Sequence, residues 1–153
     1  SDQIKVNKYF IKLMNHLDIV KDKVATFESR YITPWFLNTY TDIVVSHQWE
    51  NPLNYAYLDT LYLGYPLVHN AHMIKDVGYY YEDNNVEQGA EMLWYAITQH
   101  DKNIDEYNFK TQKILKKYSS DNKESIEIYD SLIHNLFNNK IDINTEKWFK
   151  NNN

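Results

Sequence analysis

Apolar and polar positions along the chain follow the patterns of helices separated by short strands. Apolar residues recur every three or four positions from Val6 to Leu17, which predicts an amphipathic helix. Further helices are predicted over residues 33–40, 51–63, 85–100, 101–118 and 121–137. Short apolar runs between them predict strands over residues 24–27, 42–46, 66–69 and 78–81.

Strands that alternate with helices predict βαβ units and a parallel sheet. We therefore expect the α/β fold class, with a small Rossmann-like parallel sheet flanked by helices and a helical C-terminus. One domain is expected over residues 1–137, followed by a polar tail over residues 138–153. The chain has three glycines and no glycine-rich turn after a first strand, so the dinucleotide-binding fingerprint is absent.

Proline, glycine and amide side chains mark where the helices should begin and end. Thr33-Pro34 and Asn51-Pro52 each predict an N-cap followed by proline in the first helical turn. Gly64 is placed to end the helix that opens after Asn51. The segment Asn85–Gln88 predicts a capping box at the start of the next long helix.

Composition narrows the classes of function. The 153 residues are 43% hydrophobic, which is enough for a core, and the net charge of −5 without a basic stripe argues against a nucleic-acid partner. No cysteine is present, which excludes disulfides and thiolate chemistry and fits a reducing, cytoplasmic compartment. No apolar run approaches the ~20 residues needed for a membrane span. Because the chain begins at Ser1 rather than Met, we expect a fragment or a processed chain.

Polar segments follow three of the predicted strands. They are Glu28–Arg30, His47–Asn51 and His69–His72. Ligands of open parallel sheets bind beyond the carboxyl ends of the strands, so these segments should lie along one crevice. No pair of histidines has the four-residue helical spacing of a zinc site, and we predict no metal.

A helix that opens directly after a strand offers free N–H groups and a positive dipole end to an anion, and a diphosphate fits there. Asp59 lies two turns further on, where its carboxylate can accept both hydroxyls of a ribose. Arg30 can pair with a phosphate through two hydrogen bonds. Each candidate also has an ordinary explanation: Asn51 as an N-cap, Asp59 as a solvated residue, and His47 and His69 as near-core histidines.

The run from Ser46 to Asn70, with its neighbours Phe27–Arg30, Thr33–Leu37 and Lys75–Tyr81, reads as a family signature. It resembles an uncharacterised family of bacterial and giant-virus proteins that are similar to GT-B glycosyltransferases. The resemblance covers about residues 5–118. It implies that the chain is the C-terminal, donor-binding half of a GT-B fold.

The wider resemblance is to the donor-binding domain of retaining GT-B enzymes such as glycogen and sucrose synthases. Asn51–Asn54 stands at the first block of that pattern, and Asp59 and Gly64 stand at the second. The resemblance implies that backbone N–H groups around Asn54 and Tyr55 hold the diphosphate and that Asp59 binds the ribose. Here Asn54 replaces the family's glycine.

Other residues are expected to contact the sugar or base of the donor. The family's first acid aligns with Asn51, while Glu50 lies one residue earlier, and Arg30 stands in for an Arg/Lys pair that the chain lacks. No catalytic residue is assigned. The candidate sugar or base contacts are His47, Glu50, Asn51, His69 and Asn70.

The expected function is to bind a nucleotide-diphosphosugar as part of a GT-B-type glycosyltransferase. The nucleotide sugar is the substrate, no cofactor is expected, and the chain should be inactive without its N-terminal acceptor domain. The alternative is a non-catalytic scaffold whose partner surface contains Trp49, Tyr55 and Tyr57. A nucleotide sensor or hydrolase is a third possibility, but no nucleophile–base pair is visible.

Overall fold

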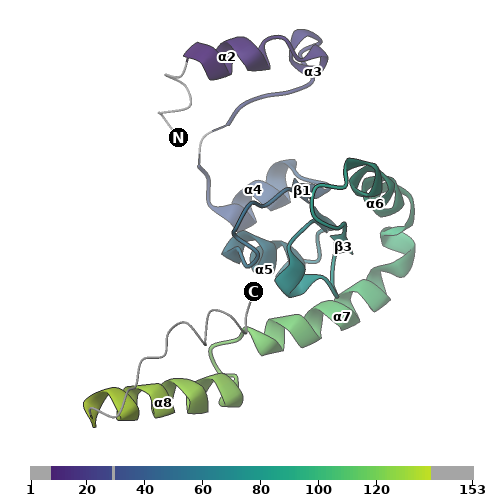
Figure 1. Cartoon of the computed structure of the whole chain (residues 1–153). Coiled ribbons are helices and arrows are strands. Elements are labelled where there is room, and N and C mark those ends of the chain that lie inside the picture. The colour runs from purple at the N-terminus through teal and green to yellow at the C-terminus, as the bar shows by residue number, and fades with distance from the viewer. Residues whose placement is uncertain (1–7, 29, 139–153) are drawn as a thin grey trace.

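The computed structural model describes residues 8–28 and 30–138. Its centre is a parallel sheet of three strands in the order β1-β2-β3 (Figure 1). The strands are β1 (Val44–Ser46), β2 (Leu67–His69) and β3 (Tyr79–Tyr80). Helices flank the sheet and form the C-terminal part of the described chain, which confirms the predicted α/β class.

Each predicted helix is present, with shifts of a few residues at its ends, whereas the short helices over residues 18–21 and 72–74 were not predicted. The long predicted helix after residue 100 begins with a 3-10 turn before its α-helical part. The elements are α2 (Lys8–Met14), α3 (Asp18–Lys21), α4 (Thr33–Tyr40), α5 (Tyr55–Tyr62), η1 (His72–Ile74), α6 (Val86–Gln99), η2 (Asp101–Asn103), α7 (Ile104–Lys117) and α8 (Lys123–Phe137).

Three of the four predicted strands form. Val45 pairs with Val68 of the central strand, which in turn pairs with Tyr79 of the predicted edge strand. The predicted strand over residues 24–27 does not form, and this prediction was wrong. An extended segment becomes a stable strand only beside a partner, and in the described chain Val24 is 74% exposed with no strand next to it.

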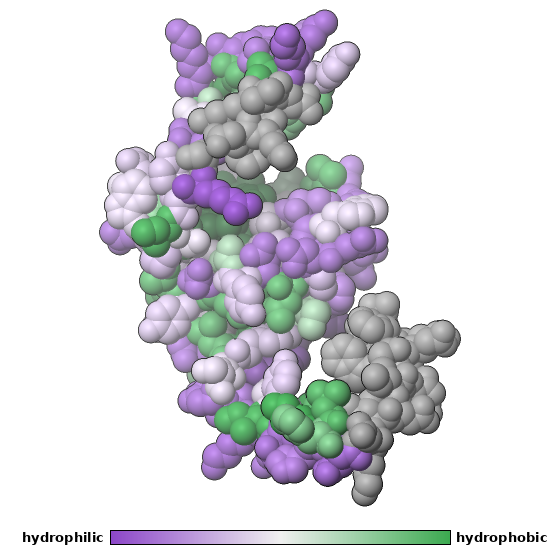
Figure 2. Space-filling model, turned by 90° about the vertical axis from the view of Figure 1, so that its left-hand side faces the viewer, coloured by the Kyte–Doolittle hydropathy of each residue, from purple (hydrophilic) through white to green (hydrophobic). Residues whose placement is uncertain are grey.

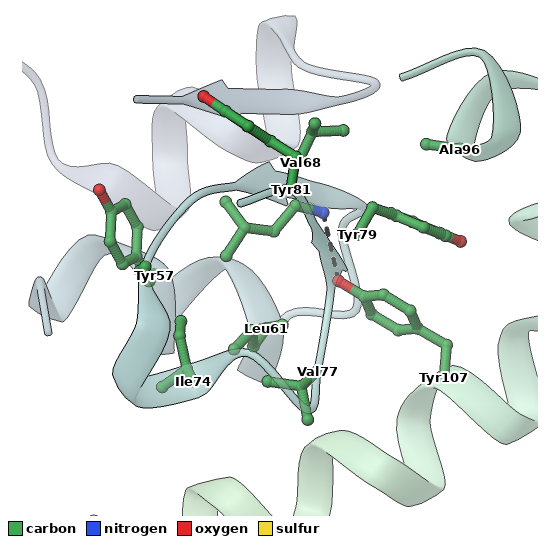
Figure 3. Close-up of a cluster of buried hydrophobic side chains, with 11 residues drawn as sticks. Tyr57, Leu61, Val68, Ile74, Val77, Tyr79, Tyr81, Ala96 and Tyr107 are labelled. Atoms are coloured by element: carbon green, nitrogen blue, oxygen red, sulfur yellow. Dashed lines mark hydrogen bonds between the residues drawn. The ribbon is translucent and has the colours of Figure 1, made fainter. Parts of the chain in front are cut away.

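The core lies around β2, whose three residues are all buried. Leu61 of α5 and Val68 of β2 are each only 1% exposed, and side chains from α6 and α7 complete the cluster (Figure 3). The Tyr107 hydroxyl accepts the N–H of Leu67 (3.2 Å) and donates to the carbonyl of Tyr65 (2.8 Å). These two bonds fasten α7 to the start of the central strand, where backbone groups need buried partners.

Gly64 ends α5, as the sequence predicts. Its φ of 77° lies in the left-handed region, which glycine adopts without steric cost. The N–H of Gly64 donates to the Leu61 carbonyl and that of Tyr65 to the Thr60 carbonyl, each at 3.1 Å. This hydrogen-bond pair is a Schellman motif, and it turns the chain from α5 into β2.

Two other predicted caps are only partly correct. Thr33 is the first helical residue of α4 and not its N-cap, which is Ile32 and makes no side-chain hydrogen bond. Asn85 does cap α6, since its side chain accepts the N–H of Gln88 at 2.9 Å. The Gln88 side chain, however, accepts from the N–H of Glu82 instead of returning to Asn85, so the capping box is half formed.

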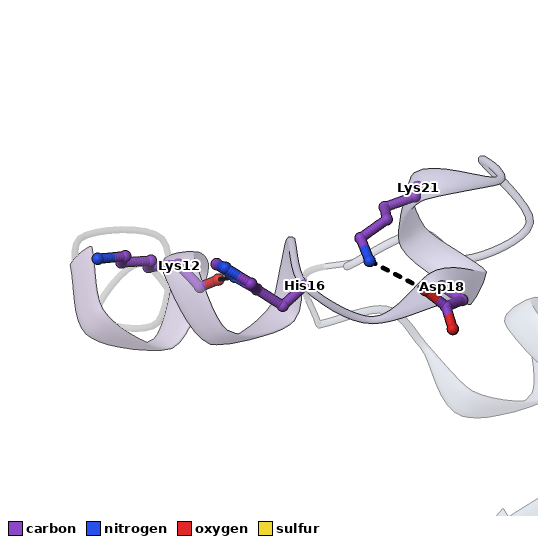
Figure 4. Close-up of polar contacts among 4 residues, drawn as sticks. All are labelled: Lys12, His16, Asp18 and Lys21. Atoms are coloured by element: carbon purple, nitrogen blue, oxygen red, sulfur yellow. Dashed lines mark hydrogen bonds and ion pairs between the residues drawn. The ribbon is translucent and has the colours of Figure 1, made fainter.

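Both ends of the described chain stand apart from this core (Figure 1). No residue of α2, α3 or α8 is buried. The polar contacts of α2 and α3 are local and exposed: His16 donates Nδ1–H to the Lys12 carbonyl (2.6 Å), and Lys21 pairs with Asp18 (2.9 Å; Figure 4). The predicted polar tail from residue 139 onward lies outside the described residues.

Apolar side chains gather on α8, at the lower end of the molecule in Figure 2. Seven large apolar residues of this helix are at least 46% exposed. They recur with helical spacing, so they form a continuous stripe along one side of α8. The members are Ile126, Ile128, Tyr129, Leu132, Ile133, Leu136 and Phe137.

Candidate functional site

The three parallel strands end at the same edge of the sheet, and polar loops meet there. His47 follows β1, Asn70 follows β2 and Tyr81 follows β3. The His47 ring lies nearly parallel to the Tyr81 ring, and its Nδ1 is 3.0 Å from the Tyr81 hydroxyl. Burial raises the pKa of Tyr81, with a further contribution from Tyr57, so the hydroxyl keeps its proton. This edge of the sheet is the candidate site.

Asn70 fixes the loops on either side of it. Its Oδ1 accepts the N–H of Gln48 at 2.7 Å, and its Nδ2 donates to the carbonyls of Gln48 (3.1 Å) and Asp83 (3.0 Å). The side chain is 5% exposed, so these bonds are largely shielded from water. Asn70 therefore positions the loops after β1 and β3 and has little capacity left for a ligand.

Helix α5 begins at Tyr55 rather than after Asn51, so Asn51 is not its N-cap. The N-cap is Asn54, whose Oδ1 accepts the N–H of Ala56 at 3.0 Å. The Asn51 N–H donates instead to the side chain of Gln48 (2.7 Å), which keeps Asn51 in the loop. The N–H of Tyr55 has no acceptor within the part of the chain that the structure describes.

Asp59 and Tyr55 share the solvent-exposed side of α5. Residues four positions apart lie on the same face of a helix, and the opposite face buries Tyr57, Thr60 and Leu61 in the core. Tyr55 is 85% exposed, and Asp59 is also exposed. The Asp59 carboxylate makes no hydrogen bond or ion pair with another described residue. A free N–H group and a free carboxylate thus lie one helical turn apart.

His69 belongs to the core and not to the surface of the site. It is fully buried, and its Nε2–H donates to the Val77 carbonyl at 2.8 Å while its Nδ1 accepts the N–H of Ala71 at 3.1 Å. Burial lowers the pKa of His69, although the Val77 carbonyl acts in the opposite direction. The ring is therefore neutral, and both nitrogens are occupied by the backbone. His69 therefore has no nitrogen free to contact a ligand, and its prediction as a donor contact was wrong.

Two other predicted residues lie at the margin of the site. Glu50 is exposed and has a φ of 54°, a left-handed conformation that costs a residue with a side chain free energy. Arg30 is exposed in the extended segment between α3 and α4, which leads away from the sheet (Figure 1). No contact in the described chain joins Arg30 to the start of α5.

An apolar cavity of about 470 Å³ lies beside the site, between the sheet and α6. His47 and Tyr81 line it together with Val68 and the α6 residue Leu93. Tyr81 was not among the predicted site residues, although it is the last residue of the strand predicted over residues 78–81. Ligands of open parallel sheets bind beyond the carboxyl ends of the strands, and the end of the edge strand therefore points to Tyr81.

The surface proposed for a scaffold is only partly present. Trp49 and Tyr55 are 75% and 85% exposed, but Tyr57 is 5% exposed and its hydroxyl lies 2.9 Å from that of Ser46. Tyr57 is therefore a core residue. Within residues 8–28 and 30–138, no group of three or more histidine, aspartate and glutamate side chains is placed to hold a metal ion.

These features define a parallel α/β protein with polar loops at the carboxyl edge of its sheet. The chain belongs to the family DUF2827, described as protein of unknown function, which matches residues 1–133. Searches of curated proteins and of solved structures give no match. None of the helices in the described ranges has the length and apolar character needed to cross a membrane.

Proposed function

We propose that this chain binds the nucleotide-diphosphosugar donor of a GT-B-type glycosyltransferase. The observation that carries the proposal is the exposed start of α5, immediately beyond the carboxyl edge of the sheet. There the unpaired N–H of Tyr55 and the unpaired carboxylate of Asp59 lie on the same face of one helix. A donor with an anionic diphosphate and a ribose diol needs this combination of groups.

In the proposed complex, the diphosphate lies against the N-terminus of α5. The N–H of Tyr55 donates to a phosphate oxygen, and the helix dipole stabilises the charge that develops on the leaving diphosphate. The N-cap Asn54 holds this turn in place. Asp59 accepts the two ribose hydroxyls. Arg30 supplies the cation if the segment before α4 moves toward the donor.

The donor sugar and base lie along the loops after β1 and β3. His47, Glu50 and Asn51 are the exposed polar residues available for contacts there. Asn70 acts indirectly by holding both loops. The acceptor would be bound by a separate N-terminal domain, so this chain alone binds the donor without transferring the sugar. We place the reaction in the cytoplasm.

A thermal-shift screen against UDP, GDP, ADP, CMP and their sugar conjugates tests donor binding. A nucleotide at ~100 times its dissociation constant stabilises the folded state by about 2.7 kcal/mol, which raises the melting temperature by several degrees. We expect one nucleotide to give such a shift. The absence of a shift with every nucleotide at millimolar concentration would contradict the proposal.

The matched variants are Asp59→Asn and Asp130→Asn. Asp130 is an exposed carboxylate on α8, far along the chain from the site. Loss of charged hydrogen bonds to the ribose should weaken the nucleotide affinity of Asp59→Asn about ten- to a hundredfold. Asp130→Asn should bind as the unmodified chain does. Equal affinities of the two variants would remove Asp59 from the ribose site.

The exposure of Trp49 and Tyr55 favours a second candidate, a non-catalytic interaction domain. Exposed aromatic side chains are common at the centres of protein interfaces. A scaffold of this kind would show no nucleotide-dependent shift, and Trp49→Ala would change partner binding without changing the melting temperature. The nucleotide screen therefore separates the two candidates.

A further inference from the structure

A second cavity lies at the other end of the sheet's edge strand, away from the α5 site. Its volume is about 280 Å³, and its walls come from β3 with the segment before it, from α6 and from α7. It shares no lining residue with α5 or with the loop over residues 47–54. A ligand of this cavity therefore occupies a different place from the proposed donor.

The floor of the cavity is a rigid group of tyrosines. The Tyr79 and Tyr107 rings are stacked, with centroids 5.6 Å apart, and both are buried. The Tyr79 hydroxyl lies 2.9 Å from Nδ1 of His100, and Tyr107 is held by its bond to the Tyr65 carbonyl. Because the core fixes these rings, a ligand meets a surface that is already formed and loses little affinity to reorganisation.

Two further tyrosines extend this aromatic surface from the buried floor to the solvent. Tyr95 of α6 is 47% exposed, and its ring centroid is 5.9 Å from that of Tyr79. Tyr80 of β3 is partly exposed and also lines the cavity. Exposed ring faces attract the weakly positive C–H groups of a ligand, since the face of an aromatic ring carries partial negative charge.

The rim of the cavity is polar and has no net charge. Lys75 and Asp76 lie on the segment before β3, and Glu106 and Lys110 lie opposite them on α7. Glu106 and Lys110 form an exposed ion pair at 2.6 Å. Asn103 adds an amide whose Nδ2 donates to the Gln99 carbonyl at 3.0 Å, which leaves its Oδ1 to accept a hydrogen bond. The rim thus offers both hydrogen-bond donors and acceptors without selecting either sign of charge.

We propose that this tyrosine-floored cavity is a binding site for an uncharged pyranose sugar. A pyranose presents C–H groups on one face of its ring, which pack on an aromatic surface, and hydroxyls at its edge that both donate and accept. The balanced rim disfavours nucleotides and other strongly charged ligands. The cavity is large enough for a single sugar unit, and Tyr95 in its wall is partly exposed to solvent.

Saturation-transfer NMR on the full chain tests this site with glucose, galactose, mannose and N-acetylglucosamine as probes. At least one of these sugars should receive saturation, with the strongest transfer to the C–H protons of one ring face. Tyr95→Ala removes an exposed ring and should weaken the affinity about three- to tenfold. Asn103→Ala should also weaken binding, because it removes hydrogen bonds to the hydroxyls.

Tyr129→Ala is the matched control, since Tyr129 is an exposed tyrosine on α8, a helix that contributes no residue to the cavity. It should bind sugar as the unmodified chain does. Circular dichroism of each variant establishes that the fold is kept. The proposal is overturned if none of the four sugars receives saturation at tens of millimolar. It is also overturned if Tyr55→Ala abolishes the signal while Tyr95→Ala retains it, because the sugar would then occupy the α5 site.

Discussion

The sheet region and the two ends of the described chain are built from the same kind of amphipathic pattern but differ in what covers it. Around β2, the apolar face of α5 is enclosed, and Leu61 is 1% exposed. On α8, which has an equally clear apolar stripe, Leu132 is 46% exposed. Helical periodicity therefore predicts that a helix exists and which side is apolar, but it does not reveal what packs against that side.

The difference has an energetic consequence. Most of the stability of a protein helix comes from packing its apolar face, and an isolated helix of about 15 residues is marginal in water. Helix α5 is held by burial of Tyr57, Thr60 and Leu61 and by its two capped ends. Helix α8 has an N-cap, since Asn122 accepts the N–H of Ser125, but no buried residue. Among the described residues, only local interactions support the helicity of α8.

The largest expected effect comes from truncating one leucine in each region. Leu61→Ala should lower the free energy of unfolding by about 2–5 kcal/mol, because it leaves a cavity in a closed core. Leu132→Ala should change it by less than about 0.5 kcal/mol, since the side chain is already exposed. Urea unfolding followed by far-UV circular dichroism measures both. A large loss for Leu132→Ala would mean that a partner covers α8.

The next largest effect is the change in the free energy of unfolding when a glycine of the sheet region is replaced by alanine. A Cβ at Gly78 would lie 2.8 Å from both the Leu67 carbonyl oxygen and Nε2 of His69, and its φ is 68°. Gly78→Ala should therefore cost about 1–3 kcal/mol or prevent folding. Gly89, in α6, has room for a Cβ at 3.6 Å from the Tyr81 ring. Gly89→Ala should instead stabilise the protein by up to about 1 kcal/mol.

Chemical unfolding of both alanine variants under the same conditions sharpens the comparison. The two substitutions add the same methyl group, so their opposite signs would come from backbone conformation and available space alone. If Gly78→Ala were neutral, the turn before β3 would be free to rearrange. The close approach of that turn to His69 would then contribute nothing to the stability of the sheet.

Much of the fold could be predicted because its signals are local. Gly64 ends α5 with the expected left-handed turn, and Asn85 caps α6. The strand predicted over residues 24–27 could not be excluded from its sequence, because strand formation depends on a neighbour that local sequence does not specify. The start of α5 was misplaced because Asn51 and Asn54 are equally good caps by composition. The long-range bond between Asn70 and the Gln48 loop is not visible in either segment.

The sequence predicts where the candidate site lies better than it predicts which residues form it. The rule that ligands bind beyond the carboxyl ends of parallel strands predicts that the loops of His47 and Asn70 lie together. The hydrogen bonds made by these two loops confirm that they do. The rule does not distinguish a residue that faces the cleft from one that turns into the core. His69 turns inward, because the left-handed turn at Gly78 brings the Val77 carbonyl within reach of its ring.

The smallest effect is a dependence of stability on pH that arises from His69. Burial holds the pKa of His69 below its ordinary value of 6.5 in the folded protein, while the unfolded chain keeps that value. At pH values below 6.5 the unfolded state therefore binds the proton more readily than the folded state does. The contribution of His69 is complete above this pH and is lost progressively as the pH falls.

His69→Gln is the variant that isolates this contribution, because the glutamine amide can still donate to the Val77 carbonyl but does not titrate. The variant will be less stable at neutral pH, since the N–H of Ala71 loses its acceptor. The informative quantity is the slope of unfolding free energy between pH 7.5 and 5.5, which should be smaller in the variant. Equal slopes would mean that water reaches the ring, and that this side of the core opens as readily as the exposed ends of the chain.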